Sequence, residues 1–386
     1  MAANKPSVLI LGGCGFIGRN LVAYLVAKNC CSHIRVVDKM LPSVAFLSPQ
    51  HKEAFASPIV KFKQGNVASA ASLQKRWNQE YDFVFNLASE TKYDQPAMIY
   101  DEKVVEVAKA VIEEAKKHTG LKRIFDISTA QIYAHGSKPA SEGGKVKPWT
   151  GIAEAKLKVE ELWLQSGLPI VILRPAIVYG PGDQSGLMPR ITIARVYRYM
   201  GNKMKFLWGG DLKLHTVHVE DVCSALWHLT SHGEVKKIYN VVDKNDTDQK
   251  KLNELLEGLF QIKTGFVNAV YCKFAKLNIK AATEAVNDKH LRPWSALCGK
   301  HKIETTPLSP YLAPELLYDH SLAVDAALLE GTGFALTHPK VSVDLLQGAI
   351  DYWTSQSVFP GLTDEEKAEV VGADEDEDDE VPSGEE

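Results

Sequence analysis

Three glycines near the N-terminus have the spacing of a turn that can approach a dinucleotide. Gly12, Gly15 and Gly18 follow the apolar run SVLIL (7–11) and precede an apolar helical pattern. Without side chains, the backbone can turn tightly, approach a pyrophosphate and let the helix pack on the strand. The N-terminus of that helix then faces the phosphates, where its N–H groups and its dipole favour negative charge.

A carboxylate further along indicates which dinucleotide is bound. Asp38 ends the second apolar run, IRVVD (34–38). A carboxylate at this place accepts hydrogen bonds from the adenosine ribose hydroxyls and repels a 2′-phosphate. The glycine turn and Asp38 together therefore favour NAD over NADP, although the neighbouring Arg35 and Lys39 would attract a phosphate. A tight structural turn without a ligand is the less favoured interpretation.

These residues need a sheet to bring them together. Short β-branched and apolar runs, typical of strands buried on both faces, alternate with helical patterns. Strands are expected at 7–11, 34–38, 59–64, 83–88, 123–128, 170–175 and 237–242, and helices at 16–28, 70–79, 102–118 and 151–166. This alternation predicts an α/β fold, a Rossmann-type doubly wound parallel sheet that binds ligands at the carboxyl ends of its strands.

The patterns divide the chain into three parts. Residues 1–180 are expected to form the NAD-binding Rossmann domain, to which the strand near 237–242 returns, and residues 181–362 a smaller mixed substrate-binding lobe with the C-terminal helices. Residues 363–386 are expected to be an acidic disordered tail, since Asp364–Glu386 holds 13 acidic residues and one lysine in a chain of net charge −4. Such a tail either aids solubility or docks a basic partner.

At several separated places the sequence resembles the extended short-chain dehydrogenase/reductase family, which includes nucleotide-sugar epimerases and dehydratases and 3β-hydroxysteroid dehydrogenases. The resemblance covers roughly residues 6–355. It rests on GGCGFIG (12–18), QGNV (64–67), FNLASET (85–91), DISTAQIY (126–133), LRPAIVYGPGD (173–183), HTVHVEDVCSAL (215–226) and YDHSLAVDAALLEGTGF (318–334).

The resemblance implies that NAD is held by the glycine turn, by the strand ends and by the helix after residue 150. The implied contacts are Gly12, Gly15, Phe16, Ile17, Gly18, Asp38, Lys39, Asn66, Val67, Leu87, Ala88, Ser89, Lys156, Pro175 and Ile177. Asn66 departs from the family pattern, which usually has an aspartate there. No metal site is expected, because the six cysteines have neither CxxC nor Cys/His ligand spacing.

The family's catalytic pattern is incomplete in this chain. Members usually have Ser or Thr and then YxxxK, in which the tyrosine exchanges a proton while the lysine lowers the tyrosine's pKa and binds the nicotinamide ribose. Lys156 matches the lysine and Thr129 the serine or threonine, but Ile152 stands at the tyrosine position. Because isoleucine has no ionisable proton, this member lacks the usual acid/base.

Three residues are candidates to replace the tyrosine, in the order Tyr133, Tyr93 and Glu154. Tyr133 belongs to the family motif but also fits a residue that only lines the site. Tyr93 follows the NLASET segment, and Glu154 also fits a solvated helix residue.

Two kinds of function agree with these residues. The first is an NAD-dependent oxidoreductase or epimerase/dehydratase acting on a hydroxyl or keto group of a steroid-like or nucleotide-sugar substrate. The second is an NAD-binding sensor or scaffold with little catalysis. Lys156 and Thr129 favour the enzyme, whereas Ile152 favours the sensor or scaffold.

In the second lobe, Arg195 and Arg198, with Arg190, are candidates to bind a diphosphate.

Composition predicts a globular cytoplasmic protein, with 45% hydrophobic and 24% charged residues. No run approaches the roughly 18 apolar residues needed to span a bilayer, and the N-terminus lacks a signal-peptide pattern.

The expected partner is a small-molecule substrate, with a homodimer left open. Nucleic acid is not expected, because no recognition motif accompanies the spread basic charge. Membrane contact through 266–282 is less favoured than an ordinary cap helix.

Overall fold

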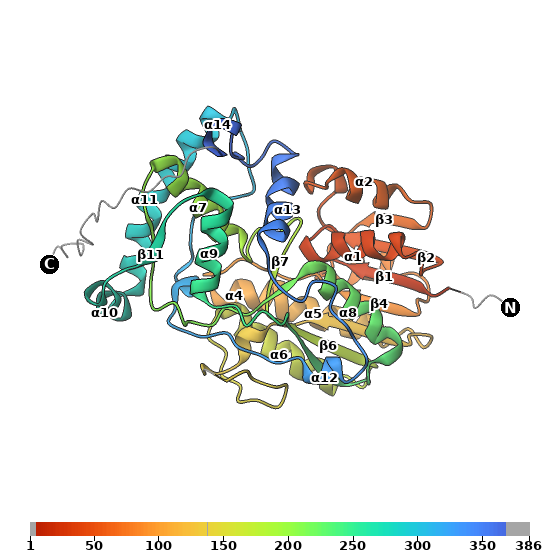
Figure 1. Ribbon diagram of the computed structural model, residues 1–386. Helices are drawn as coiled ribbons and strands as arrows, with labels where there is room; N and C mark the ends of the chain where they lie inside the picture. Colours follow the sequence, from red (N-terminus) through yellow and green to blue (C-terminus); the bar gives the residue numbers. More distant parts are fainter. Residues whose placement is uncertain (1–4, 137, 368–386) are drawn as a thin grey trace. The chain divides into compact units, whose positions relative to one another are not determined.

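The computed structural model describes residues 5–136 and 138–367 (Figure 1). These residues form two compact units, each drawn from three stretches of the chain. The first unit falls within Met1–Val178, Val217–Lys244 and Val324–Pro339, and the second within Tyr179–Thr216, Asn245–Ala323 and Lys340–Glu386. The expected acidic tail lies outside the described residues from 368 onward.

Seven strands form one parallel sheet in the first unit, in the order β10-β6-β5-β4-β1-β2-β3. The strands are β1 (Ser7–Leu11), β2 (His33–Asp38), β3 (Val60–Gln64), β4 (Phe83–Asn86), β5 (Arg123–Ile127), β6 (Ile170–Pro175) and β10 (Lys237–Val241). This is the doubly wound order in which the chain starts at the centre of the sheet. The predicted fold class is confirmed.

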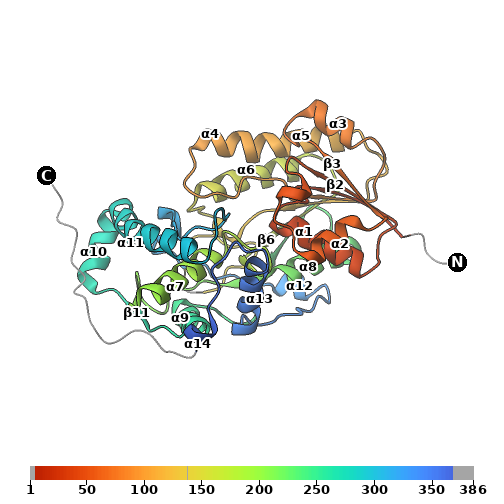
Figure 2. The same ribbon diagram turned by 90° about the horizontal axis from the view of Figure 1, so that it is seen from above.

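Helices cover both faces of this sheet (Figure 2). Helices α1 (Phe16–Ala27), α2 (Pro49–Ala56) and α8 (Val219–His232) lie on one face, and α3 (Ala70–Arg76), α5 (Glu106–Ala115) and α6 (Gly151–Gln165) on the other. The remaining elements of the unit are η1 (Pro42–Val44), α4 (Ala97–Tyr100), the π-helical turn η2 (Asp101–Val105), η3 (Ala130–Ile132) and α12 (Ala327–Glu330). Because both faces are covered, neighbouring strand residues such as Leu9 and Ile10 are both fully buried.

The second unit is mainly helical. Its elements are α7 (Met188–Met200), β8 (Met204–Phe206), α9 (Gln249–Phe260), β11 (Thr264–Phe266), α10 (Ala269–Leu277), α11 (Ile279–Lys300), η4 (Pro314–Leu317), α13 (Val343–Thr354) and α14 (Asp364–Lys367). Strands β8 and β11 pair with each other. The chain passes between the units at β7 (Ile177–Tyr179) and β9 (Thr216–His218), which also pair. No described helix is long and apolar enough to cross a membrane.

A buried carboxylate starts helix α7. The Asp183 side chain accepts backbone N–H bonds from all four residues 185–188, at 2.7–3.0 Å. Its carbonyl oxygen accepts a bond of 2.9 Å from the Trp353 indole on α13. The turn before the helix is thereby tied both to the helix N-terminus and to the C-terminal part of the unit.

The start of the expected tail is bound within the second unit. Arg195 on α7 is fully buried, and its Nη2 donates to both carboxylate oxygens of Glu366, at 2.9 and 3.1 Å. Its Nε donates to the Pro360 carbonyl at 2.7 Å. Arg198, one turn further along, donates to the Glu366 carbonyl and to that of Gln261. Both arginines, candidates for a diphosphate, therefore bind groups of their own unit.

Two truncations test whether residues 363–367, which include Glu366, stabilise the second unit more than residues 368–386 do. Removing 368–386 deletes mostly acidic residues, and we expect the free energy of unfolding to change little. Removing 363–386 also deletes Glu366 and leaves buried Arg195 without its carboxylate, which should cost about 1–3 kcal/mol because Glu366 is itself partly exposed. Denaturant unfolding of both proteins, with Glu366→Gln as the matched point variant, measures the difference. Equal midpoints for the two truncations would contradict this role of Glu366.

A buried histidine makes the second unit sensitive to acid. His290 on α11 is buried edge-on against the Tyr197 ring, 5.3 Å between ring centres, and neither ring nitrogen has a hydrogen-bond partner among the described residues. Burial, with the neighbouring Lys289, lowers the pKa of His290 from 6.5 to about 4. Between these values the unfolded chain binds the proton and the folded chain does not, so stability falls as pH falls.

We expect His290→Phe to reduce this loss. Going from pH 7 to pH 5, the variant should lose about 2 kcal/mol less of its free energy of unfolding than the native protein. Denaturant unfolding at both pH values gives this difference, in which contributions from other groups cancel. An identical loss in both proteins would show that His290 is not the group responsible.

Candidate active site

The inner side of the glycine turn has no room for side chains, whereas its outer side is open. Gly12, just after β1, has φ +81°, and a Cβ there would lie 2.6 Å from the Ala88 nitrogen after β4. A Cβ on Gly18 would overlap the Gly12 carbonyl oxygen. Gly15 precedes α1 and is exposed, and a Cβ there would meet only the Gly12 oxygen, at 3.2 Å. The exposed backbone at the start of α1 is therefore open to a phosphate.

Asp38 lies beside this turn at the end of β2. The carboxylate is 9% exposed and accepts N–H bonds from Cys14 at 2.8 Å and Met40 at 2.9 Å. An ionised carboxylate has about four acceptor positions, so it retains capacity for ribose hydroxyls. Lys39 is exposed, and its carbonyl accepts a bond from Gln64. The glycine turn and Asp38 thus fit the adenosine half of a dinucleotide.

The other expected cofactor contacts lie after the carboxyl ends of neighbouring strands. Asn66 and Val67 follow β3, and Leu87, Ala88 and Ser89 follow β4. The Leu87 N–H donates to the Leu11 carbonyl at 2.8 Å, which continues the pairing of β4 with β1 toward Gly12. The Asn66 side chain accepts from the Ala68 N–H at 3.1 Å, so it stabilises its own turn.

The remaining predicted contacts come from α1, β6 and β7. Phe16 and Ile17 are the first residues of α1, Pro175 ends β6 and Ile177 begins β7. Every predicted cofactor residue thus belongs to the first unit.

Lys156 on α6 is a buried cation with carboxylates nearby. It is 9% exposed, and no hydrogen bond among the described residues includes its ammonium group. Burial lowers the pKa of Lys156, while Asp126 and Glu160 oppose that effect. Burial also raises the pKa of Asp126, which accepts a bond of 2.6 Å from Asn86. A buried ammonium without a protein acceptor fits the anchor for a ribose hydroxyl pair.

A hydrogen-bond network joins α6 to the sheet beside Lys156. Arg174 on β6 binds Glu160 through Nε at 2.9 Å and Nη2 at 2.5 Å, and both side chains are almost fully buried. Ser128, after β5, donates to the same carboxylate. Arg174 also donates to the Tyr133 hydroxyl at 2.8 Å, and this hydroxyl donates to Asn240 on β10 at 2.8 Å.

Tyr133, the first of the candidates for the missing acid/base, is therefore part of this network. The residue is 3% exposed, and its hydroxyl both accepts and donates a bond to protein. Burial raises the pKa of Tyr133, and Arg174 opposes the effect. Glu154, the third candidate, is exposed on α6.

Tyr93, the second candidate, is connected to the start of α6 through Gln131. The Gln131 amide donates to the Tyr93 hydroxyl at 2.7 Å and accepts from Thr150 at 3.0 Å. The Gln131 backbone N–H also donates to Thr129 Oγ1 at 3.2 Å. Thr150 caps α6 by accepting from the Ala153 N–H. Gln131 thus joins three hydroxyl groups, two through its side-chain amide and one through its backbone N–H.

Ile152 lies on the first turn of α6, just after the capping residue Thr150. It is 9% exposed and belongs to the apolar cluster of the first unit, against which Tyr93 also packs. The helix therefore presents an apolar side chain one turn before Lys156, and a phenol from another segment packs on the same cluster. The sequence analysis missed Gln131, whose position in the DISTAQIY segment was the available signal. It also missed the Arg174–Glu160 pair.

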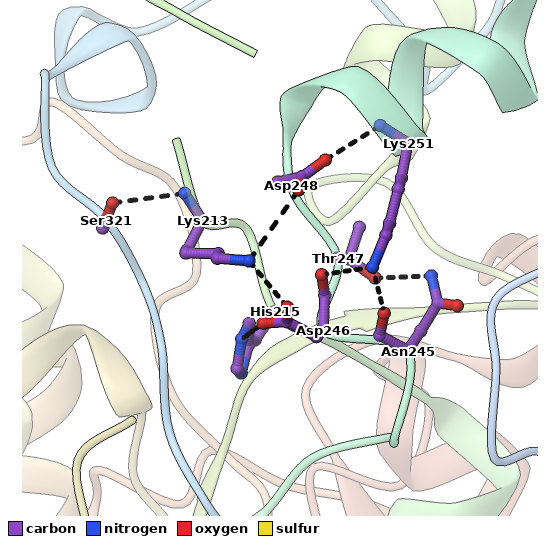
Figure 3. A network of polar contacts seen from close by, with 8 residues as sticks. All are labelled: Lys213, His215, Asn245, Asp246, Thr247, Asp248, Lys251 and Ser321. Carbon is purple, nitrogen blue, oxygen red and sulfur yellow. Dashed lines mark hydrogen bonds and ion pairs between the residues drawn. The ribbon is translucent and has the colours of Figure 1, made fainter. Parts of the chain in front are cut away.

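In the second unit, a polar network joins the residues just before β9 to the loop before α9 (Figure 3). Lys213 binds Asp246 at 2.7 Å, and His215 binds the other oxygen of Asp246 at 3.0 Å. Burial opposes ionisation of Asp246, but Lys213 and His215 hold the pKa of this carboxyl below its ordinary value. Lys251 donates to the carbonyl oxygens of Asn245 and Asp246. The network fixes the loop that leads into α9.

Sequence comparison finds relatives among nucleotide-sugar and sterol enzymes. The chain is 26% identical to a dTDP-D-glucose 4,6-dehydratase of Dictyostelium discoideum over 258 residues, 61% of this chain and 57% of that enzyme. It is 29% identical to a decarboxylating sterol-4-alpha-carboxylate 3-dehydrogenase of Saccharomyces cerevisiae over 188 residues, 46% of this chain and 52% of that enzyme. The matches span little more than half the length of these two relatives.

Structural comparison and a family model agree with the sequence relatives. A crystal structure of dTDP-glucose 4,6-dehydratase from Bacillus anthracis in complex with NAD has a TM-score of 0.65 and 18% identity, covering 91% of this chain and 97% of that one. At this identity the likeness shows the fold. The model of the NAD dependent epimerase/dehydratase family matches residues 8–242. Since this match spans more than half of the chain, the chain belongs to the NAD dependent epimerase/dehydratase family, and its cofactor is NAD.

Proposed function

We propose that this protein is an NAD-dependent oxidoreductase or epimerase/dehydratase acting on a carbon that carries a hydroxyl or keto group. The observation that carries the proposal is the set of three hydroxyls, Tyr93, Thr129 and Thr150, which Gln131 joins at the start of the helix that bears Lys156. A protein that only binds NAD needs the glycine turn and Asp38 but has no need of this arrangement.

In the proposed reaction, some residues bind the cofactor and others orient the substrate. NAD, when bound, supplies the hydride acceptor. The glycine turn and Asp38 hold its adenosine diphosphate half, and Lys156 donates to the nicotinamide ribose. The Thr129 hydroxyl accepts from the Gln131 N–H, so its own proton is available to orient a substrate oxygen.

In this proposal Tyr93 replaces the missing tyrosine as acid/base. Its hydroxyl accepts from the Gln131 amide. The Tyr93 oxygen would take the proton of a substrate hydroxyl as hydride leaves the same carbon for NAD, and would return a proton to that oxygen when a keto group is reduced. Tyr133 is less suited, because its hydroxyl is 3% exposed and bonded to both Arg174 and Asn240. Tyr133 thus serves to position the segment that carries Thr129 and Gln131.

The named relatives guide the choice of substrate. They include an enzyme of a nucleotide sugar and one of a sterol. We therefore propose a small molecule of one of these two classes. The cytoplasmic location, a homodimer and the docking of a basic partner by the acidic tail stay predictions from the sequence.

A second candidate function is an NAD-binding sensor or scaffold with little turnover. The specific observation in its favour is the packing of Ile152 into the apolar cluster, which leaves α6 without a proton donor at the usual place. The enzyme is preferred because Tyr93 packs on the same cluster and reaches the α6 N-cap through Gln131.

Cofactor preference tests the role of Asp38. We expect calorimetry to show tighter binding of NADH than of NADPH. Asp38→Asn removes the charge that repels a 2′-phosphate, so the preference should narrow by at least about tenfold. Glu113→Gln, at an exposed carboxylate on α5, is the matched control and should leave the ratio unchanged. Equal or tighter NADPH binding by the native protein would refute this role.

Turnover tests the acid/base. NADH formation is followed with a 3β-hydroxysteroid as probe. Because an epimerase or dehydratase returns the hydride to its product, turnover of dTDP-glucose and UDP-glucuronic acid is followed by chromatography of the sugar nucleotides. We expect Tyr93→Phe to lower kcat by about 10²–10⁴-fold with little change in NAD affinity, and Ile152→Tyr to raise turnover by restoring YxxxK. Tyr311→Phe, at an exposed tyrosine of the second unit, is the control. If Tyr133→Phe abolished turnover at unchanged stability while Tyr93→Phe did not, the acid/base would be Tyr133.

A further inference from the structure

Two histidines and a glutamate meet on the first unit, and none of the three is among the residues assigned to NAD. They come from two distant parts of the sequence, His218 and Glu220 at the junction of β9 and α8, and His338 near the end of the stretch Val324–Pro339. One ligand atom from each of the three side chains lies within 4.8 Å of the other two. We propose that His218, Glu220 and His338 bind a divalent transition-metal ion of the zinc type.

The chemistry of the three side chains agrees with such an ion. Imidazole nitrogen and carboxylate oxygen are common zinc ligands, and two histidines with one glutamate are a known donor set for a site with an open fourth position. His338 Nε2 lies 2.9 Å from Glu220 Oε2, and the two imidazole centres lie 4.2 Å apart. Ligand atoms of a tetrahedral zinc site lie about 3.3–3.6 Å apart. Side-chain movements of about 1 Å therefore form the site.

A fourth residue holds the two parts of the site together without being a ligand. Asp221, fully buried in the first turn of α8, accepts backbone N–H bonds from Thr337 at 2.6 Å and His338 at 3.0 Å. The backbone that carries His338 is thereby fixed against the helix that carries Glu220. Outer carboxylates of this kind orient metal ligands, so the backbone part of the site is already formed.

Exposure permits entry of an ion from solvent. The His218 ring is buried, the His338 side chain is 22% exposed and the Glu220 side chain 46%. Neutral imidazole has one lone pair, and in this structure His218 Nδ1 accepts from the Glu220 N–H at 3.4 Å. Binding a metal through either nitrogen of His218 replaces this long bond. The ion would then cross-link the start of α8 to the stretch around His338.

Calorimetry and absorption spectroscopy test the site on the full chain after removal of metal by a chelator. We expect one equivalent of Zn²⁺ to bind, Co²⁺ to give the absorption bands of tetrahedral coordination, and Zn²⁺ to raise the unfolding midpoint. Glu220→Gln and His338→Gln should each weaken Zn²⁺ binding by at least about 10–100-fold. Unchanged NAD binding by these variants verifies that they are folded.

Two control variants identify other sources of metal binding. His228 and His232 stack one turn apart on the same helix, 4.2 Å between ring centres, and Cys30 and Cys31 have their sulfurs 4.0 Å apart. His232→Gln and Cys30→Ser should leave the affinity unchanged. No Zn²⁺ binding at millimolar concentration, or binding that survives His338→Gln but is lost in either control, would overturn the proposal and leave Glu220–His338 as an ion pair only.

Discussion

The buried pair of Arg174 and Glu160 is the interaction on which the polar interior of the first unit depends. It connects β6 to α6 through two hydrogen bonds between side chains that are only 4% and 3% exposed. Removing one partner of such a pair typically costs about 3–5 kcal/mol, because the other charge stays buried and unpaired. Through Arg174 the pair also fixes Tyr133, and through Tyr133 it reaches Asn240 on β10.

Charge balance explains why this interior tolerates a lysine. Lys156 lies one turn before Glu160 on α6, and Asp126 on β5 is the second carboxylate near it. Two carboxylates and two cations, counting Arg174, make the region neutral overall, although Lys156 itself donates no hydrogen bond to a described residue. The nearby carboxylates balance the charge of this lysine, and its ammonium still has donors for a ligand.

The predicted replacement of the family's usual tyrosine by Ile152 agrees with the packing of α6. Ile152 joins the apolar cluster that includes Ala155 and Val159 of the same helix, so the helix gains buried apolar area there. Thr150 still caps the helix, and through Gln131 the cap is linked to the Tyr93 hydroxyl. The N-terminus of α6 thus has the hydroxyls of Thr150 and Tyr93 near it, although Ile152 supplies none.

The sequence by itself determined the sheet and where in it the predicted cofactor contacts lie. Strands buried on both faces are continuous apolar runs, and all seven in the parallel sheet were predicted to within about two residues. The glycine turn was predictable because its conformation allows few alternatives to glycine. Apart from Lys156 on α6, the implied cofactor contacts lie at or just after the carboxyl ends of strands or at the start of the first helix, so their location followed from the order of the elements.

Only the tertiary structure decided how the polar side chains pair. Gln131 with Tyr93, Arg174 with Glu160 and Tyr133, and Asp221 with the backbone of 337–338 are contacts between residues 14 to 117 positions apart. The sequence pattern around a polar side chain does not predict its hydrogen-bond partner, because any donor can pair with any acceptor that the fold brings within about 3 Å. For the same reason the sequence placed Glu366 in a free tail, whereas buried Arg195 binds it.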